Sequence, residues 1–336
     1  MSVKHKEAFS ILFTGVNSGV KSGATEHLSL AEIADNAGFE ICQDLAERPD
    51  LVICVDYKPR YRNLLRKAKR LGIPRVLVKH EPPTVIPEHG EISAGDLFDA
   101  VITRGVTSNT PVFNIGALWD TRFTDRNQRY QRIVAITADK WSFHPRELYS
   151  LRRQVYSADS RLDLFGHGWE QSRHERVIRL AKEMLVVIRS RTFPKLKNLR
   201  FAFLAPQNYL GPTRDKHEVL SRYQVSLVIE NDISAMSEKL LDCILSGTIP
   251  VYVGPKVSDF GIPSDLVVES SPNLESVLES INIALALDHV AYRKRALTWV
   301  KLKSSEDSWD PRKIGESLIN HAVGKLKYRS RHSDLG

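Results

Sequence analysis

Charged side chains stand beside two apolar runs in residues 223–255, YQVSLVIENDISAMSEKLLDCILSGTIPVYVGP. Glu230 and Asn231 directly follow the first run, and Glu238 and Lys239 fall in the predicted first turn of a helix. Free backbone N–H groups and the positive dipole end of a helix N-terminus favour an anion. Lys239 could therefore neutralise a diphosphate, while the two glutamates could accept hydrogen bonds from ribose hydroxyls. On periodicity alone, the same residues also fit purely structural roles. Glu230 would then be a loop carboxylate, Glu238 would complement the helix dipole, and Lys239 would be solvated.

A strand, a helix and a second strand must position these side chains. The first strand covers 225–229, a helix opens near Ser234, and the second strand, reached through Gly247, covers 249–253. In an open α/β sheet, ligands bind at the carboxyl ends of the strands. We therefore expect a cleft at that edge, beside the loop between the first strand and the helix.

Apolar runs also alternate with helical patterns along the rest of the chain, which with 336 residues is too long for one small core. In the first half, the runs that read as buried strands cover 11–16, 51–56, 76–79 and 100–103. Residues 61–74 place apolar side chains on one helical face and basic side chains on the other. Continuous apolar strands separated by helices predict a parallel sheet that is covered on both faces.

The second half repeats this pattern. Strands are expected near Ile133 and Leu162, and at 225–229, 249–253 and 266–268. The polar and basic stretch 120–132 marks the junction between the halves. The predicted architecture is therefore α/β, with two Rossmann-like, doubly wound domains facing a cleft. We expect these domains at 1–128 and 129–310, followed by a C-terminal helix or tail at 311–336.

The runs IEN, SEKL and SGTIPVYVGP resemble, in order and spacing, the donor-binding motif of the α-1,3-fucosyltransferases, family 10 of the glycosyltransferases. That motif is close to FEN, a short spacer, YxTEKL and PVYxG. The resemblance implies a soluble, bacterial-type member with a GT-B fold, an N-terminal acceptor-side domain and a C-terminal nucleotide-sugar domain. It implies inverting transfer of L-fucose from GDP-fucose to a hydroxyl of a glycan or glycolipid. The donor-binding residues would be Glu230, Asn231, Ser237, Glu238 and Lys239.

Two upstream segments extend the resemblance. In GPTRDKHEVLSRYQ, Lys216 stands shortly before the first strand of the motif, where the family often has a lysine. ADKWSFHPRELYSLRRQVYSADSRLDLFGHGW is similar to the family's arginine-bearing helix, whose arginine reaches the leaving diphosphate. Arg152 or Arg153 is the match, and we favour Arg153, although a basic pair on an amphipathic helix is most often a solvated face. In the FGHGW that follows, His167 and Trp169 either line the donor or acceptor side or belong to a packed loop.

Glu81 is the candidate general base. It lies in RVLVKHEPPTVIPEHG, just after a buried-looking strand and before a stiff turn formed by Pro82 and Pro83. The segment resembles the family's ESP or EPP segment, whose glutamate is taken as the base. A carboxylate on such a loop would face the interdomain cleft, and the plain alternative is a turn residue that satisfies its own backbone. Glu88 is the next carboxylate to consider.

The motif departs from the family at three positions. Ala235 replaces an aromatic residue, Ser237 a threonine and Ile229 a phenylalanine. The missing aromatic removes a donor-pocket contact, so an inverting transferase that uses a different nucleotide sugar is the second hypothesis. A non-catalytic basic binding protein is the third and ranks last, because the basic helices lack the interleaved aromatics of a nucleic-acid surface. We therefore expect no nucleic-acid partner.

The composition indicates which ligand charge, which cellular compartment and which cofactors to expect. Lys and Arg number 48 against 40 Asp and Glu, and the formal charge of +8 favours anionic ligands. The 3 cysteines are far apart and suggest a reducing compartment without disulfides or zinc. Without a signal-peptide cleavage site or a membrane-spanning apolar run, we expect a cytoplasmic protein, and peripheral contact with the inner face of a membrane stays open. No paired histidine spacing or DxD loop occurs, so we expect no metal and no cofactor beyond the nucleotide-sugar co-substrate.

Overall fold

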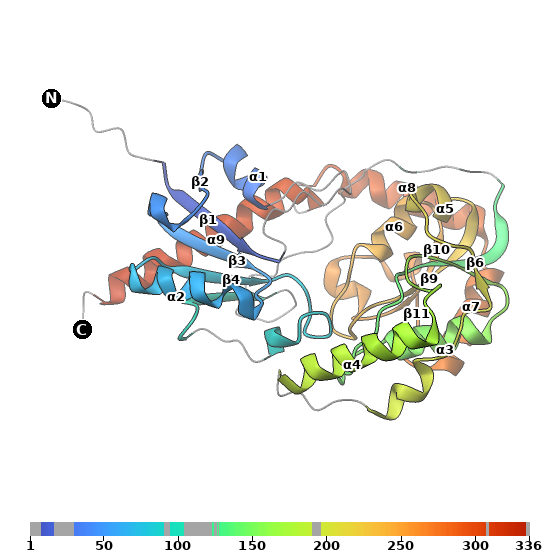
Figure 1. Cartoon of the computed structure of the whole chain (residues 1–336). Coiled ribbons are helices and arrows are strands. Elements are labelled where there is room, and N and C mark those ends of the chain that lie inside the picture. Colours follow the sequence, from blue (N-terminus) through green and yellow to red (C-terminus); the bar gives the residue numbers. More distant parts are fainter. Residues whose placement is uncertain are drawn as a thin grey trace. The chain divides into compact units, whose positions relative to one another are not determined.

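The chain forms two compact units in the computed structural model (Figure 1). The N-terminal unit comprises Met1–Asn114 and Asp307–Gly336, and the C-terminal unit comprises Ile115–Glu306. The structure describes residues 8–16, 30–90, 95–103, 123, 126, 128–189, 196–306 and 309–333. Within these residues, no helix is both long enough and apolar enough to cross a membrane.

A parallel sheet forms the centre of the N-terminal unit. Its strand order within the described residues is β2-β1-β3-β4-β5. The strands are β1 (Ser10–Gly15), β2 (Glu40–Cys42), β3 (Leu51–Val55), β4 (Arg75–Lys79) and β5 (Ala100–Thr103). The apolar runs of the first half form β1, β3, β4 and β5, which confirms the predicted buried parallel sheet. The sequence does not reveal β2, because its residues, EIC, are too few to form an apolar run.

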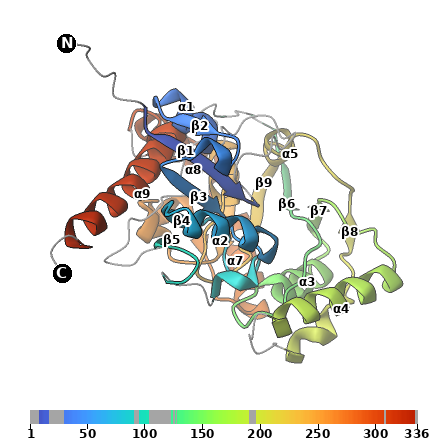
Figure 2. The same ribbon diagram turned by 60° about the vertical axis from the view of Figure 1, so that its left-hand side comes forward.

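Helices cover both faces of this sheet. They are α1 (Leu30–Asn36), α2 (Arg62–Arg70) and α9 (Pro311–Ser333). Alternate residues of β3 face opposite sides, so Leu51 and Ile53 pack with α1 and α9, whereas Val52 and Cys54 pack with α2. The α9 side chains in this core are Leu318, Ile319, Ala322 and Val323. The last helix of the chain therefore completes the core of the N-terminal unit (Figure 2).

The C-terminal unit contains a second parallel sheet, with the order β11-β10-β9-β6-β7-β8 in the part of the chain that is described. Its strands are β6 (Tyr130–Ile136), β7 (Leu162–Phe165), β8 (Asn208–Tyr209), β9 (Tyr223–Ile229), β10 (Ile249–Val253) and β11 (Val268–Glu269). Ile133 of β6 pairs with Leu162 of β7 and with Val225 of β9. Four of the five predicted strands lie at their expected positions. The strand expected at 266–268 is instead a 3₁₀ turn that ends at Leu266, followed by β11, and the short edge strand β8 is an addition.

Helices and short 3₁₀ turns connect the strands. The helices of the C-terminal unit are α3 (Tyr149–Ala158), α4 (Arg173–Arg189), α5 (Lys216–Leu220), α6 (Lys239–Leu245), α7 (Leu274–Ala286) and α8 (His289–Lys303). The 3₁₀ turns are η1 (Leu45–Glu47), η2 (Pro59–Tyr61), η3 (Pro87–Gly90), η4 (Leu196–Phe201), η5 (Val257–Phe260) and η6 (Ser264–Leu266). Side chains cap the N-termini of two of these helices. Asp215 accepts a hydrogen bond from the Glu218 N–H at the start of α5, and Asp288 caps the start of α8.

Candidate functional site

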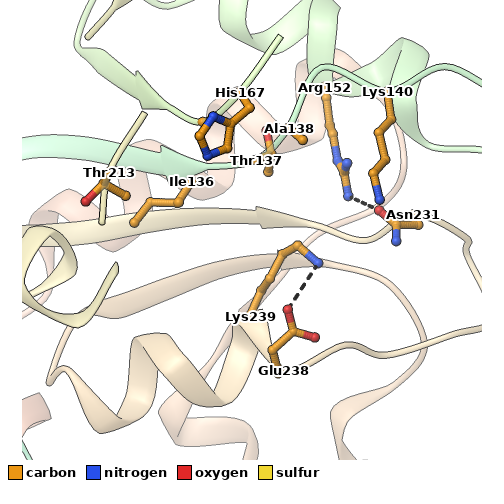
Figure 3. A pocket seen from close by; sticks show the side chains of 11 residues that line it. Ile136, Thr137, Ala138, Lys140, Arg152, His167, Thr213, Asn231, Glu238 and Lys239 are labelled. Atoms are coloured by element: carbon orange, nitrogen blue, oxygen red, sulfur yellow. Dashed lines mark hydrogen bonds and ion pairs between the residues drawn. The ribbon is translucent and has the colours of Figure 1, made fainter. Parts of the chain in front are cut away.

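The C-terminal sheet grows in two directions from β6. The chain adds β7 and β8 on one side of β6, and then β9, β10 and β11 on the other. Loops that follow β6 and β9 therefore leave in opposite directions, which opens a crevice at the carboxyl ends of these strands. A pocket of about 270 Å³ lies there (Figure 3). It is lined by Ile136, Thr137, Ala138, Lys140, Arg152, Gly166, His167, Thr213, Asn231, Glu238 and Lys239.

Cationic side chains dominate this pocket. Lys140, Arg152 and Lys239 line it together with His167 and with one carboxylate, that of Glu238. Figure 3 shows Lys140 and Arg152 entering from one side and Lys239 from α6 on the other. Three cations against one carboxylate leave an excess of positive charge, which attracts anions. The pocket therefore suits an anion with several oxygen atoms, such as a diphosphate.

Arg152 is held rigidly at the edge of the pocket. Its side chain is 2% exposed. Nε donates a hydrogen bond to the Ile229 carbonyl at 2.8 Å, and Nη2 donates to Oδ1 of Asn231 at 2.9 Å. The guanidinium also lies 5.0 Å from the centre of the Tyr149 ring. These contacts join α3 to the carboxyl end of β9, so Arg152 and Asn231, both predicted site residues, come together as one unit.

Glu230 positions Lys239 through Ser237. Glu230 is fully buried, and both of its carboxylate oxygens accept hydrogen bonds from Ser237, one from the N–H at 2.8 Å and one from the hydroxyl at 2.6 Å. Ser237 Oγ in turn accepts a hydrogen bond from Nζ of Lys239 at 2.9 Å. Glu230 is not among the lining residues, and its predicted hydrogen bond with a ribose hydroxyl stays a prediction. The carboxylate orients the serine that holds the lysine.

The helix after β9 begins later than predicted. The sequence suggests a start near Ser234, whereas α6 begins at Lys239, with Glu238 as its N-cap residue. Asp232 explains the delay, because its Oδ1 accepts hydrogen bonds from the N–H and the hydroxyl of Ser234 at 2.9 and 2.8 Å. Such a local side-chain turn competes with helix formation. Glu238 and Lys239 consequently lie where the loop meets α6, with Lys239 Nζ 3.9 Å from Glu238 Oε1.

Arg153, the arginine favoured from the sequence, is not among the residues that line the pocket. It is 1% exposed, pairs with the buried carboxylate of Asp139 and donates to the Leu204 carbonyl at 2.8 Å. Burial lowers the pKa of Arg153 to about 10, although Asp139 opposes this shift. Arg179 also donates to Asp139 Oδ2 at 2.9 Å. Asp139 lies between two lining residues of the loop after β6, so its ion pairs with Arg153 and Arg179 hold that loop in place. Of the predicted pair, Arg152 is the one that reaches the pocket.

The FGHGW segment divides between the pocket and the core. Gly166 has φ +139°, and a Cβ there would lie 1.9 Å from the Thr137 carbonyl oxygen, so only glycine fits. Trp169 is packed and donates from Nε1 to the same carbonyl oxygen at 2.7 Å. His167 is exposed and lines the pocket. His167 therefore lies at the pocket, whereas Trp169 belongs to a packed loop.

Lys216 lies near the site without lining it. Its Nζ lies 2.7 Å from Oδ2 of Asp242, a buried carboxylate of α6. Burial raises the pKa of Asp242, while Lys216 opposes this effect. The pair joins α5 to α6, so Lys216 supports the helix that carries Lys239.

Glu81 belongs to the N-terminal unit and follows β4. Oδ1 of the buried Asp56 accepts hydrogen bonds from the backbone N–H groups of His80 at 2.7 Å and of Glu81 at 2.9 Å. His89 Nδ1 contacts the Glu81 carbonyl oxygen at 2.8 Å, and since a carbonyl only accepts, Nδ1 carries the proton. The Glu81 backbone is therefore held on both sides, with its side chain half-buried. Glu88, in η3, is also half-buried.

The sequence prediction missed Thr137, Lys140 and Thr213, all of which line the pocket. Thr137 and Lys140 directly follow the strand predicted near Ile133, so the rule that ligands bind at strand ends could have found them. Thr213 lies in a loop and carries no such signal. Within the described residues, no group of 3 or more His, Cys, Asp and Glu side chains is arranged to hold a metal ion.

The sequence matches no protein-family model and no curated protein. The structure is similar to the crystal structure of an α1,3-fucosyltransferase, with a TM-score of 0.54 and 14% identity over 96% of this chain and 92% of that one. The same values apply to that fucosyltransferase with GDP. It is also similar to Anabaena HepE in complex with UDP-glucose, with a TM-score of 0.51 and 12% identity over 94% of this chain and 99% of that one. Together with the two parallel-sheet α/β units, these similarities identify a GT-B fold, as predicted.

Proposed function

We propose that the chain is an inverting glycosyltransferase that binds the diphosphate of a nucleotide sugar in the cationic pocket between β6 and β9. The observation that carries this proposal is the convergence of Lys140, Arg152 and Lys239 at the switch point of the C-terminal sheet. The hydrogen bonds that link the buried Glu230 through Ser237 to Lys239 support it, because the motif residues are arranged to orient this lysine. The acceptor is a hydroxyl of a glycan or glycolipid.

GDP-fucose is the donor that the motif favours. The IEN and SEKL runs carry this preference, and an α1,3-fucosyltransferase structure with GDP has a similar fold. A different nucleotide sugar is the second candidate. It is favoured by Ala235, which stands where the fucosyltransferase motif has an aromatic residue, and by the similarly folded HepE, whose structure holds UDP-glucose.

The proposed transfer is a displacement at the anomeric carbon. The acceptor oxygen forms a bond to this carbon while the bond to the diphosphate oxygen breaks, and the nucleoside diphosphate leaves with the bonding electrons. Arg152, Lys140 and Lys239 stabilise the negative charge that gathers on the leaving diphosphate. In this scheme, cationic side chains stabilise the leaving group without a metal ion.

Glu81 is the proposed general base, which takes the proton of the acceptor hydroxyl. A positioned base contributes about 10²–10⁴-fold to such a reaction. Its backbone N–H donates to Asp56 and its carbonyl accepts from His89, and these hydrogen bonds support the role because they fix the peptide that carries the carboxylate. Glu88 is the alternative on the same segment.

Thermal denaturation with GDP, UDP and CMP tests the donor assignment. A ligand that binds only the folded protein stabilises it by about 2.7 kcal/mol at 100 times its dissociation constant. GDP should raise the melting temperature most. A larger shift with UDP would favour the second donor class, and no shift with any nucleotide would contradict the proposed site.

A further inference from the structure

One segment of the N-terminal unit concentrates positive charge. Residues 58–73, KPRYRNLLRKAKRLGI, contain 7 basic and no acidic residues, against a formal charge of +8 for the whole chain. The segment comprises η2, α2 and the turn that follows. The charges of the remaining residues nearly cancel in sum, although other elements, such as α8, are also basic.

The cations of α2 lie on one face of the helix. Leu65 and Ala68 are fully buried against the sheet, and the basic side chains of the helix are exposed. Arg62, Arg66 and Arg70 repeat at intervals of four residues and so form one stripe along the exposed face. Lys67 and Lys69 flank this stripe.

This cationic face lacks compensating charge among the described residues. Lys69 lies 3.5 Å from Asp96, but both side chains are exposed, and such a pair contributes little. No described carboxylate forms an ion pair with Arg62, Arg66, Lys67 or Arg70. Like charges four residues apart destabilise a helix. Each such pair costs an exposed helix only about 0.2–0.5 kcal/mol, which an external anion would offset.

An apolar side chain adjoins the cations. Leu71, directly after α2, is 50% exposed. Tyr57 and Phe98 are buried against each other, and the Tyr61 ring is covered by the Arg60 guanidinium at 4.8 Å. The segment therefore offers a leucine for insertion between lipids but no free aromatic ring on which nucleic-acid bases could stack.

We propose that the exposed face of α2, with Leu71 at its end, docks on the surface of an anionic lipid bilayer. The phosphate groups of the lipid headgroups would face the arginine stripe, and Leu71 would enter the boundary between headgroups and acyl chains. This inference does not rest on the donor or on Glu81. It gives the protein a site for peripheral contact with a membrane that could present a lipid-linked acceptor.

Sedimentation with vesicles tests this proposal. The full-length protein should bind vesicles of phosphatidylcholine with phosphatidylglycerol and should not bind vesicles of phosphatidylcholine alone. Each basic side chain near an anionic bilayer increases binding by about fivefold. The triple variant Arg66→Gln, Lys67→Gln, Arg70→Gln should therefore require on the order of a hundredfold more anionic lipid for half-maximal binding.

A matched variant controls for net charge. Lys182→Gln, Lys294→Gln, Lys301→Gln removes the same charge from exposed positions on α4 and α8, and should bind vesicles nearly as the wild type does. Both triple variants should keep the wild-type melting temperature and GDP response. Equal losses of vesicle binding in the two variants, or equal wild-type binding to neutral and anionic vesicles, would overturn the proposal. Binding to a single-stranded oligonucleotide but not to vesicles would also overturn it.

Discussion

Lys239 and Arg152 reach the pocket in different ways. The Lys239 side chain is 24% exposed and has one hydrogen bond, to Ser237. Arg152 is almost fully buried and is fixed by the Ile229 carbonyl and the Asn231 amide. A guanidinium held at two points presents its remaining N–H groups in a fixed direction, whereas an ammonium on a flexible stem can follow its ligand. At the residue scale, the site thus combines one rigid and one adaptable cation.

Lys239→Ala should weaken GDP binding by roughly 10–100-fold, because a hydrogen bond to a charged group contributes about 1.5–3 kcal/mol. Guanosine binding should change little, since Lys239 is assigned to the phosphates. Isothermal titration calorimetry measures both affinities. Lys182→Ala, at an exposed lysine of α4, is the control and should alter neither. Equal losses for GDP and guanosine would remove Lys239 from the phosphate site.

Substitutions of the two adjacent arginines should have different effects, one on the stability of the protein and the other on its affinity for GDP. Arg153→Met removes one cationic partner of Asp139, which keeps Arg179, and leaves the Leu204 carbonyl without its donor, so it should lower the free energy of unfolding by about 1–3 kcal/mol. Arg152→Met removes a cation from the pocket and should lower GDP affinity by about tenfold or more. Urea denaturation and calorimetry on both variants give the comparison. A stable Arg153→Met protein that no longer binds GDP would return the phosphate role to Arg153.

At the scale of elements, the segment after β4 depends on the charge state of one histidine. Burial lowers the pKa of His89 to about 4, although the Glu81 carbonyl opposes this shift. Because the folded pKa lies below the unfolded value of 6.5, the unfolded state binds more protons. The free energy of unfolding should therefore fall as the pH drops from 6.5 towards 4. His89 should account for a loss of about 3 kcal/mol at pH 4.

Urea denaturation of the wild type and of His89→Gln at pH 7 and pH 4 measures this contribution. The variant lacks the titrating ring, so its stability should fall less between the two pH values. If both proteins lost the same free energy, His89 would not be the group that titrates.

The sequence predicts elements where the pattern is local. Buried strands such as β3 and β9 are continuous apolar runs, so their positions follow from the sequence, whereas the short strands β2 and β8 have no such run. The apolar face of α9 could be recognised by its periodicity, but periodicity does not say which sheet covers it. Its packing on the N-terminal sheet depends on contacts between opposite ends of the chain.

For the site, too, the sequence predicts what lies in one segment but not what distant segments bring together. Asn231, Glu238 and Lys239 lie in one segment and could be predicted together, and all three line the pocket. Lys140 joins them only because β6 pairs with β9, two strands far apart in the chain. The choice between Arg152 and its neighbour depends on which way each side chain of α3 points, and sequence spacing does not resolve adjacent residues.

At the scale of the whole molecule, the two units carry different parts of the proposed reaction. The C-terminal unit provides the donor pocket, and the N-terminal unit provides Glu81. Glu81→Gln should lower transfer by about 10²-fold or more, with GDP affinity and melting temperature nearly unchanged. Release of GDP from GDP-fucose in the presence of glycan acceptors measures transfer. Glu88→Gln is the matched control, and an active Glu81→Gln protein would make Glu88 the next candidate.

The central claim is that the cationic pocket of the C-terminal unit binds a nucleoside diphosphate through its phosphates. Calorimetric titration with guanosine, GMP and GDP, beside the matching uridine series, tests it most directly. For the preferred base, affinity should rise with each phosphate, so that the diphosphate binds about 100-fold more tightly than the nucleoside, and this difference should shrink in Arg152→Met. Equal affinities along both series, or no binding of either diphosphate, would contradict the account.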